Sequence, residues 1–390
     1  MSEFKASGFR NEFGNAGPDL VGVTTMTSPY YFVPPSGSTA ERPSNPAPGM
    51  LRFNTDIGRL EVWRNDHWAT ILGESPNLGK ANSSGGNSGG TGTRAIAFGG
   101  NNGSPFDDIE YFTIETLGNA QDFDDMVRGT GTAGQACASR TRAVYAGGQV
   151  AGAPSSDEME FVTIASTGSA TDWGANLRDG RDFLSALSNQ TRGMWVGGRT
   201  SGGSTATNLI DYITIASSGV ISEDFGDLRT AALWYPMSLA SSVRGVIGQS
   251  NGSASPTNID YISISTLGNA QDFGTLSDNF GGVGASNATR GIFGGGYNPS
   301  LCNSITFVTI ATTGNSQDFG DLSETNRSAG AATNPTRAVF VGGKIPATVN
   351  TLEYITLPTT GNAIDFGNLA GSNSGIKGNV GACSNGHGGL

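Results

Sequence analysis

One pattern occurs six times between residue 93 and the end of the chain, and this repeat constrains the fold more than any other feature. Each copy opens with an Arg before a short apolar run, at Arg94, Arg142, Arg192, Arg244, Arg290 and Arg337. Each copy closes with an Asp before an aromatic residue, at Asp122, Asp172, Asp224, Asp272, Asp318 and Asp365. Both series are spaced by 46 to 52 residues. Periods of about 40 to 50 residues made of short strands are typical of propeller blades. The sequence therefore predicts an all-β fold with a six-bladed β-propeller over residues 93–390.

Each repeat is expected to contain four strands. In the last copy these are Gly330–Asn334, Arg337–Val341, Leu352–Leu357 and an outer strand that begins at Ala363–Phe366. A Gly pair follows the second strand in five copies, and Gly248-Gln249 replaces it in the fourth. The order of apolar run, Gly pair and Tyr-bearing strand is similar to that of a kelch blade.

The two ends of the array complement each other. The small-residue strand that opens the later copies is missing before Arg94. The chain ends with a spare copy of that strand, Gly381 to Asn385, which no apolar run follows. We therefore expect the C-terminal strand to complete the first blade, which would remove both free sheet edges.

Composition limits the classes of partner. The net charge is −11, so the chain lacks the basic surface that binding to nucleic acid requires, and an anionic membrane surface is disfavoured. No apolar stretch has the length of a membrane span, and we expect no membrane insertion. Three cysteines form no disulfide framework. Cys137 and Cys383 occupy equivalent repeat positions, which predicts that both are small buried residues.

The residues before the array divide into three parts. Residues 1–40 are expected to be an extended N-terminal arm, in which Tyr30–Pro35 is apolar and rich in proline. Residues 41–72 are expected to form a small β-meander with strands at Met50–Thr55, Arg59–Arg64 and His67–Leu72. Residues 73–92 form a Gly/Ser/Asn linker. A meander of this size is marginal alone, so copies of itself or a larger host surface should cover its apolar face.

The string from Ser38 to Ile71 resembles a module of tailed-bacteriophage virion proteins, in particular tail fibres. The repeats share the sequence patterns TRAVFxGG and EYITIATTGNAxDFG, and they are similar to propeller-like arrays of phages of marine cyanobacteria. The resemblance implies a virion structural protein that is assembled in the host cytoplasm and forms homo-oligomers in the particle. Other virion proteins would bind residues 1–72.

Two roles are compatible with this resemblance. The first is a tail-associated fibre or adhesin that contacts a host surface glycan or protein through its propeller loops. The second is a purely structural head-decoration or neck and tail assembly protein without a host ligand.

No catalytic, cofactor-binding or metal-binding residue is predicted. The repeated Asp residues belong to the repeat structure, and we expect them to accept hydrogen bonds from turn N–H groups or to form buried pairs with the repeat arginines. His67 lies beside Trp68 and His387 at a frayed C-terminus, and two such histidines predict neither a triad nor a metal site. A propeller glycan hydrolase is disfavoured because no carboxylate pair stands out from the repeat.

Three loop features could still contact a ligand. Asp107-Asp108 and Asp124-Asp125 are expected on solvated loops, with Ca²⁺ binding as the alternative. The connections between the second and third strands are rich in Ser, Thr, Asn and Gly, and equivalent loops of a propeller gather on one face. Trp234 and Tyr235 interrupt the small-residue pattern of the fourth repeat and are the best candidates for a surface contact.

Overall fold

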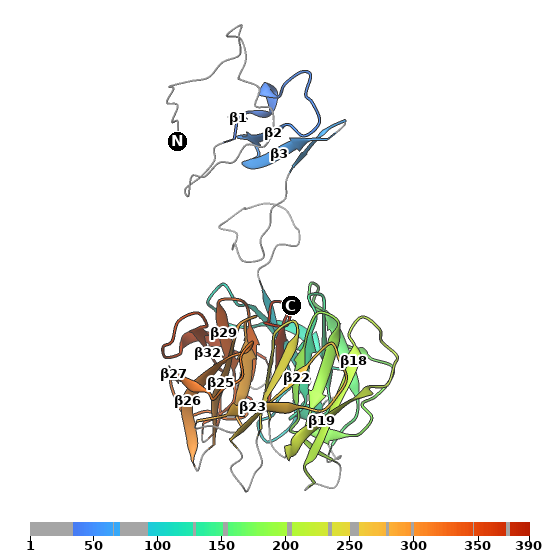
Figure 1. Cartoon of the computed structure of the whole chain (residues 1–390), viewed down its shortest axis with the longest axis vertical. Helices are drawn as coiled ribbons and strands as arrows, with labels where there is room; N and C mark the ends of the chain where they lie inside the picture. The colour runs from blue at the N-terminus through green and yellow to red at the C-terminus, as the bar shows by residue number, and fades with distance from the viewer. Residues whose placement is uncertain are drawn as a thin grey trace, which may run out of the picture. The chain divides into compact units, whose positions relative to one another are not determined.

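The computed structural model describes residues 34–64, 66–70, 93–127, 130–150, 155–200, 205–232, 236–249, 257–277, 281–297, 300–345, 347–371 and 375–390. The chain divides into two compact units, Met1–Ser75 and Pro76–Leu390 (Figure 1). Within the described residues the protein is all-β, with one 3-10 turn at Thr39–Glu41 and no α-helix. No helix in these ranges has the length and apolar character needed to cross a membrane. The predicted linker, and the predicted arm up to residue 33, lie outside the described residues.

The first unit contains one four-stranded sheet in the order β1-β2-β3-β4. Its strands are β1 (Ser36–Gly37), β2 (Leu51–Asn54), β3 (Arg59–Trp63) and β4 (Trp68–Thr70). The three predicted strands of the meander are confirmed, and β2 and β3 are shorter than expected. Strand β1 lies within residues 1–40, the predicted arm, and pairs in parallel with β2, so it belongs to the sheet. The predicted turn before β3 uses Gly58 at a φ of 63°, a conformation that glycine adopts without a steric penalty.

The second unit contains six four-stranded antiparallel sheets, numbered here by repeat. Sheet 1 comprises β34 (Gly381–Ser384), β5 (Arg94–Phe98), β6 (Asp108–Thr113) and β7 (Gln121–Asp125). Sheet 2 comprises β9 (Gln135–Ala138), β10 (Arg142–Ala146), β12 (Met159–Thr163) and β13 (Thr171–Asp172). Sheet 3 comprises β15 (Ser185–Ser188), β16 (Arg192–Val196), β18 (Thr207–Thr214) and β19 (Glu223–Ala232).

Sheet 4 comprises β20 (Met237–Ala240), β21 (Arg244–Gly248), β22 (Asn258–Ser263) and β23 (Gln271–Thr275). Sheet 5 comprises β24 (Val283–Ser286), β25 (Arg290–Tyr297), β26 (Leu301–Thr309) and β27 (Gln317–Asp321). Sheet 6 comprises β28 (Gly330–Thr333), β29 (Arg337–Val341), β32 (Thr351–Thr356) and β33 (Ile364–Asn368). Three two-stranded ribbons pair β8 (Thr130–Thr132) with β11 (Gln149–Val150), β14 (Arg181–Asp182) with β17 (Arg199–Thr200), and β30 (Lys344–Ile345) with β31 (Ala347–Thr348).

Two predictions about the strands are confirmed. The second strand of every sheet begins at the repeat Arg. The C-terminal strand β34 completes sheet 1, because Gly381 to Ser384 pair antiparallel with Phe98 to Ala95. The chain therefore closes its first sheet with its last strand, about 290 residues away in sequence.

Neighbouring sheets pack face to face through six separate hydrophobic clusters. Each cluster joins two sheets that are adjacent in number, and one joins sheet 6 to sheet 1. In that last cluster Val339 and Phe366 of sheet 6 pack with Ala97 and Phe112 of sheet 1. The first strands also contact one another in the order β34, β9, β15, β20, β24, β28, and β28 contacts β34 again. The small side chains of these strands allow the close approach that their contacts require.

Backbone hydrogen bonds form a second series of links between sheets. A Gly in the connection before each outer strand donates its N–H to the carbonyl of the aromatic residue in the preceding outer strand. The six pairs are Gly168 with Phe123, Gly219 with Trp173, Gly268 with Phe225, Gly314 with Phe273, Gly361 with Phe319 and Gly118 with Phe366. The last pair again joins sheet 6 to sheet 1. The outer strands are thus tied to each other at the positions where the sequence repeats its Asp-aromatic pair.

Candidate functional site

The repeat arginines hold neighbouring sheets together. Each guanidinium lies over an aromatic ring of the third strand of its own sheet, with 4.3 to 5.0 Å between Cζ and the ring centroid. Each also donates from Nη1 to a carbonyl of the next sheet, as Arg290 does to Leu357 at 2.7 Å. In sheet 6, Arg337 reaches the carbonyl of Ile114 in sheet 1 at 3.0 Å. Stacking and a charged hydrogen bond together fix the side chain between two sheets.

The repeated Asp residues behave differently from the prediction. All six are exposed, and it is the aromatic residue after each that is buried. The expected pair between these residues and the repeat arginines is wrong in the described residues, because those arginines bind carbonyls and rings. Asp172 does accept a turn hydrogen bond, from the N–H of Gly174 at 2.9 Å. Asp224 pairs with Arg178, which follows β13 of sheet 2, and Asp272 pairs with Arg229, which lies in β19 of sheet 3.

A different acidic position is buried, and sequence reasoning missed it. The residue before the aromatic of the third strand is acidic in five of the six repeats, at Glu110, Glu160, Asp211, Asp260 and Glu353. Each of these carboxylates accepts a hydrogen bond from the segment that leaves the preceding sheet, at 2.5 to 3.0 Å. Burial raises the pKa of Asp211, Asp260 and Glu353. Arginines and hydrogen bonds oppose that rise at the two aspartates, whereas only the hydrogen bonds from Ser323 oppose it at Glu353. The recurring acidic-aromatic dipeptide was the signal that could have identified them.

In the fourth repeat the buried carboxylate has one more hydrogen-bond partner from its own sheet. Gln249, which replaces the second Gly of the pair, is fully buried and donates its side-chain amide to Asp260. Asp260 also accepts from the backbone N–H of Arg229 at 3.0 Å. The departure from the Gly pair therefore coincides with an additional hydrogen bond to the buried carboxylate.

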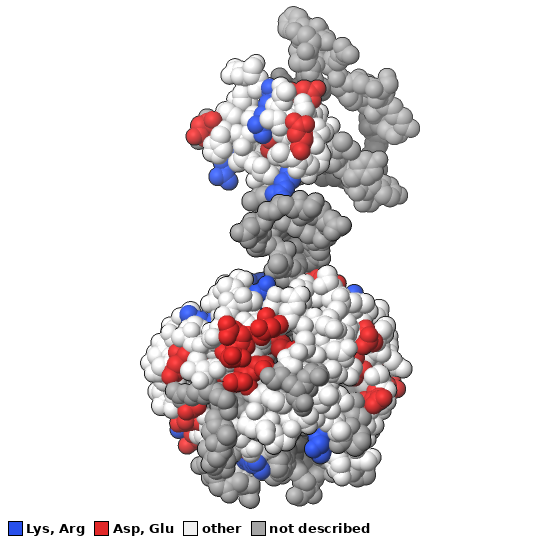
Figure 2. All heavy atoms as spheres, turned by 180° about the vertical axis from the view of Figure 1, so that it is seen from behind, with Lys and Arg blue, Asp and Glu red and all other residues white. Residues whose placement is uncertain are grey.

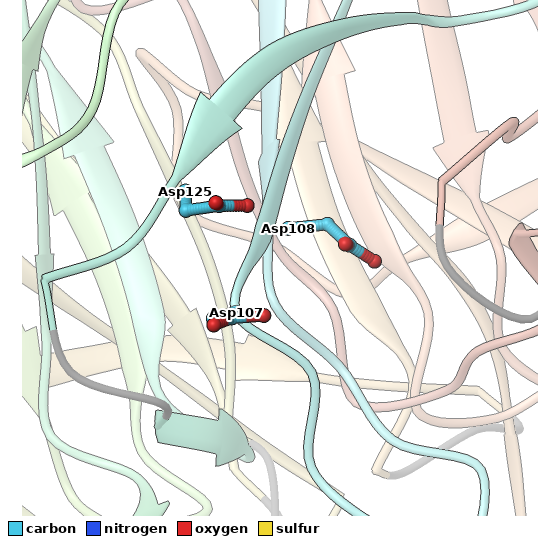
Figure 3. Close-up of side chains that lie close together, drawn as sticks. All are labelled: Asp107, Asp108 and Asp125. Atoms are coloured by element: carbon cyan, nitrogen blue, oxygen red, sulfur yellow. The ribbon is translucent and has the colours of Figure 1, made fainter.

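Chemistry-bearing side chains are most concentrated on sheet 1. Asp107, Asp108 and Asp125 have carboxylate oxygens within 4.8 Å of one another, and Figure 3 shows them at neighbouring strand ends. They are the only such group of possible metal ligands within the described residues. The predicted loop position is wrong for Asp108, Asp124 and Asp125, because Asp108 is the first residue of β6 and the other two end β7. Asp108 and Asp125 pair across the ladder. Acidic side chains also gather on the face of the second unit that Figure 2 shows.

The carboxylates of Asp108 and Glu110 already lie near a cation of the chain itself, the ammonium of Lys377. Nζ of Lys377 lies 3.7 Å from Asp108 and 2.7 Å from Oε2 of Glu110, and the side chains of Lys377 and Glu110 are fully buried. We call Asp107, Asp108, Glu110, Asp125 and Lys377 the closure cluster, because Lys377 belongs to the C-terminal segment that completes sheet 1. Asp125 is exposed, yet desolvation of its carboxyl by neighbouring groups, followed by the charge of Asp107, raises its pKa. Ca²⁺ usually takes six to eight oxygen ligands, and Ca²⁺ binding here stays the untested alternative to a solvated acidic surface.

The first strands of all six sheets and His387 line a cavity of about 60 Å³. The prediction of a frayed C-terminus is wrong for His387. Its Nε2 lies 2.9 Å from the carbonyl of Ala138 and 3.2 Å from Oγ of Ser188, and the next residue donates its N–H to Ser286. Burial, with the charge of Arg140 as a smaller cause, lowers the pKa of His387 to about 4.

The Ser188–His387 contact is not arranged for nucleophilic catalysis. The hydroxyl of Ser188 donates to the carbonyl of Ala138 at 2.8 Å and accepts from the N–H of the same residue at 3.1 Å. A nucleophilic serine would instead give its proton to the imidazole, which a third group would orient. The side chain of Ser188 in β15 therefore links two first strands, because its hydroxyl bonds both backbone groups of Ala138 in β9.

The remaining candidates have mixed outcomes. Trp234 and Tyr235 lie outside the described residues, so their surface contact stays a prediction. Cys137 and Cys383 are buried thiols, as expected, and burial raises the pKa of both. His67 is exposed, and its Nδ1 lies 2.5 Å from Asp66. A comparison with known proteins found no family model and no curated protein that matches this chain.

Proposed function

We propose that the six sheets are the blades of a closed, kelch-like β-propeller whose first blade is completed by β34. Three series of contacts support this arrangement: those between first strands, those of the repeat arginines and those of the loop glycines. Each series includes a link from sheet 6 to sheet 1. A straight stack of sheets would lack the contacts of Arg337 with Ile114 and of Gly118 with Phe366.

We further propose that the chain is a non-enzymatic phage virion protein, a tail-associated fibre or adhesin component. Its first unit attaches to other virion proteins, and its propeller presents loops to a host surface glycan or protein. The observation that carries this proposal is a division of roles within each repeat. The arginine and the third-strand aromatic are engaged within and between sheets in every copy, whereas the connection between the second and third strands changes in length and composition. Variable loops on a rigid scaffold are the usual position of binding residues.

Adsorption to cells tests this role. The purified full-length chain, labelled with a fluorophore, is mixed with cells of a susceptible marine cyanobacterium and with cells of a resistant strain. Saturable binding to the susceptible cells, together with slower adsorption of phage in the presence of the chain, is the expected result. A chain that is present in purified particles but binds neither strain would be a head-decoration or neck and tail assembly protein.

Two further measurements test the other parts of the proposal. Antibody labelling of intact particles should place the chain on the tail, and labelling of the head would contradict a fibre or adhesin. Incubation with host polysaccharide should release no new reducing ends, and their release would contradict a non-enzymatic role.

A further inference from the structure

The dipeptide Asn-Gly occurs three times in the chain, at Asn102, Asn251 and Asn385. In this dipeptide the backbone nitrogen of the glycine can attack the side-chain carbonyl carbon of the asparagine, because no Cβ stands in the way. The reaction is one cause of the thermal lability of asparagine in proteins. Asn251 lies outside the described residues. The other two asparagines have different surroundings, so the structure predicts which of them reacts.

Asn102 lies in the connection between β5 and β6, where residues 102–105 are all exposed. Gly103 has a φ of 84°, and a Cβ built on it meets no heavy atom within 4 Å in the described part of the chain. Oδ1 of Asn102 accepts a hydrogen bond from Oγ1 of Thr348 at 2.7 Å. A rotatable hydroxyl at this oxygen stabilises the negative charge that develops on it when the carbonyl carbon is attacked. Asn102 is therefore accessible, and the glycine after it has room to move.

Asn385, which follows β34, is held by the first strand of the array. Its Oδ1 accepts from the backbone N–H of Arg94 at 2.8 Å, and its own N–H donates to the carbonyl of the same residue at 3.2 Å. A Cβ built on Gly386 would lie 2.6 Å from Cγ2 and 2.7 Å from Oγ1 of Thr93. Turning the side chain of Asn385 towards the nitrogen of Gly386 would break its hydrogen bond to β5. It would also shift a backbone that is packed closely against Thr93.

We propose that Asn102 is a site of spontaneous deamidation in the folded chain and that Asn385 is protected from this reaction. The backbone nitrogen of Gly103 loses its proton to a base from the solvent and attacks Cγ of Asn102. The bond from Cγ to the side-chain nitrogen breaks, and ammonia leaves. Water then opens the succinimide at either carbonyl, which gives aspartate or isoaspartate. The net reaction consumes one water and releases one ammonia, and it does not depend on the proposed role in a virion.

The modified residue would lie where a connection of sheet 1 meets sheet 6 and the C-terminal segment. Thr348, the partner of the Asn102 side chain, belongs to β31 between the second and third strands of sheet 6. Asn101 exchanges both backbone hydrogen bonds with Gly378, at 2.9 and 3.0 Å, in the segment that leads into β34. Isoaspartate adds a methylene to the main chain beside this pair, and its carboxylate adds negative charge to the connection that also carries Asp107. Deamidation should therefore loosen the attachment of the C-terminal segment to this connection.

Peptide mapping of the full-length chain after incubation at mildly alkaline pH tests the assignment. In urea both asparagines lose their surroundings, so Asn102 and Asn385 should deamidate at rates within about threefold of each other, since each precedes a glycine. In the folded chain Asn102 should keep most of this rate, whereas the rate of Asn385 should fall by about tenfold or more. The proposal would be overturned if Asn102 stayed intact in the folded chain while the unfolded chain reacted. Equal rates for the two asparagines in the folded chain would overturn it as well.

Ion-exchange chromatography provides a second test, because the product carries an additional negative charge. In an Asn251→Gln background a main acidic form should accumulate with time, and Asn102→Gln should abolish it, since glutamine closes the corresponding larger ring much more slowly. Hydrogen exchange on the separated acidic form should be faster at the amides of Asn101 and Gly378 and unchanged at that of Asn385. Persistence of the acidic form in Asn102→Gln, or unchanged exchange at Asn101 and Gly378, would contradict the proposal.

Discussion

Replacing Lys377 with Met should strongly destabilise the second unit. Lys377 and Glu110 are both fully buried, and Nζ of Lys377 lies 2.7 Å from Oε2 of Glu110. The other oxygen of Glu110 accepts hydrogen bonds from the N–H groups of Ala370 and Gly371 at 2.5 and 2.7 Å. Removing the ammonium leaves a buried carboxylate with these two donors only. Breaking a buried ion pair in this way costs about 3 to 5 kcal/mol.

The expected change in melting temperature follows from the size of the unit. In a domain of this size, 1 kcal/mol shifts the melting temperature by about 2 °C. Lys377→Met should therefore lower it by about 6 to 10 °C. Lys377→Met combined with Glu110→Gln removes both charges, and it should recover at least half of the loss because no unpaired charge remains.

Calorimetry and urea unfolding of the full-length chain measure both effects. Lys344→Met is the matched control, because Lys344 is exposed and its loss should change the free energy of unfolding by less than about 0.5 kcal/mol. The reasoning would be refuted if Lys377→Met lowered the free energy of unfolding no more than Lys344→Met does. So would a double variant whose loss equals the sum of the two single losses, because the charges would then be uncoupled.

Three other predictions concern single positions. Folding lowers the pKa of His387 from 6.5 to about 4, so the contribution of the neutral imidazole to the free energy of unfolding is full above pH 6.5 and is lost as the pH falls towards 4. Between pH 7 and 4.5 the wild type should therefore lose about 2 kcal/mol more than His387→Gln in urea titrations, after allowance for a partly exposed ring. Asp124 has a φ of 142° where the other repeats have Gly, so Asp124→Gly should stabilise the second unit by about 1 kcal/mol. Gly274→Asp should destabilise it by more than about 2 kcal/mol, because the new Cβ would lie 2.3 Å from a carbonyl oxygen of the next sheet. Melting curves of the two variants test both predictions. Arg290→Lys keeps the charge but loses the planar stack on the Phe307 ring, so it should lower the free energy of unfolding by about 1 to 2 kcal/mol. A melting curve that matches that of the wild type would show that this stacking is unimportant.

The repeat predicted the secondary structure well because its information is local. The Arg before each apolar run marks the start of the second strand in all six sheets, and alternation with flanking glycines sets the strand ends. The spare small-residue strand at Gly381–Ser384 could be matched to the missing one before Arg94 by comparison of repeats alone. Burial of Cys137 and Cys383 followed from their equivalent positions in two copies.

The partners of the charged groups could not be read in the same way. A repeated Asp and a repeated Arg suggest a pair, but Arg290 binds a carbonyl of the next sheet and the repeated Asp residues are exposed. The buried carboxylates bind segments that leave the preceding sheet, and Glu110 receives its hydrogen bonds from residues about 260 positions away. Such contacts depend on which sheets are neighbours, which no period within one repeat specifies.

The sequence by itself determined the number of repeats, the strands within each and the return of the last strand to the first sheet. The tertiary structure alone decided that Lys377 meets Glu110 and that His387 lines the cavity between the first strands. Alternation assigns side chains to two faces of a strand but does not say which face is covered. That choice depends on the elements that pack against the sheet, and these come from distant parts of the chain.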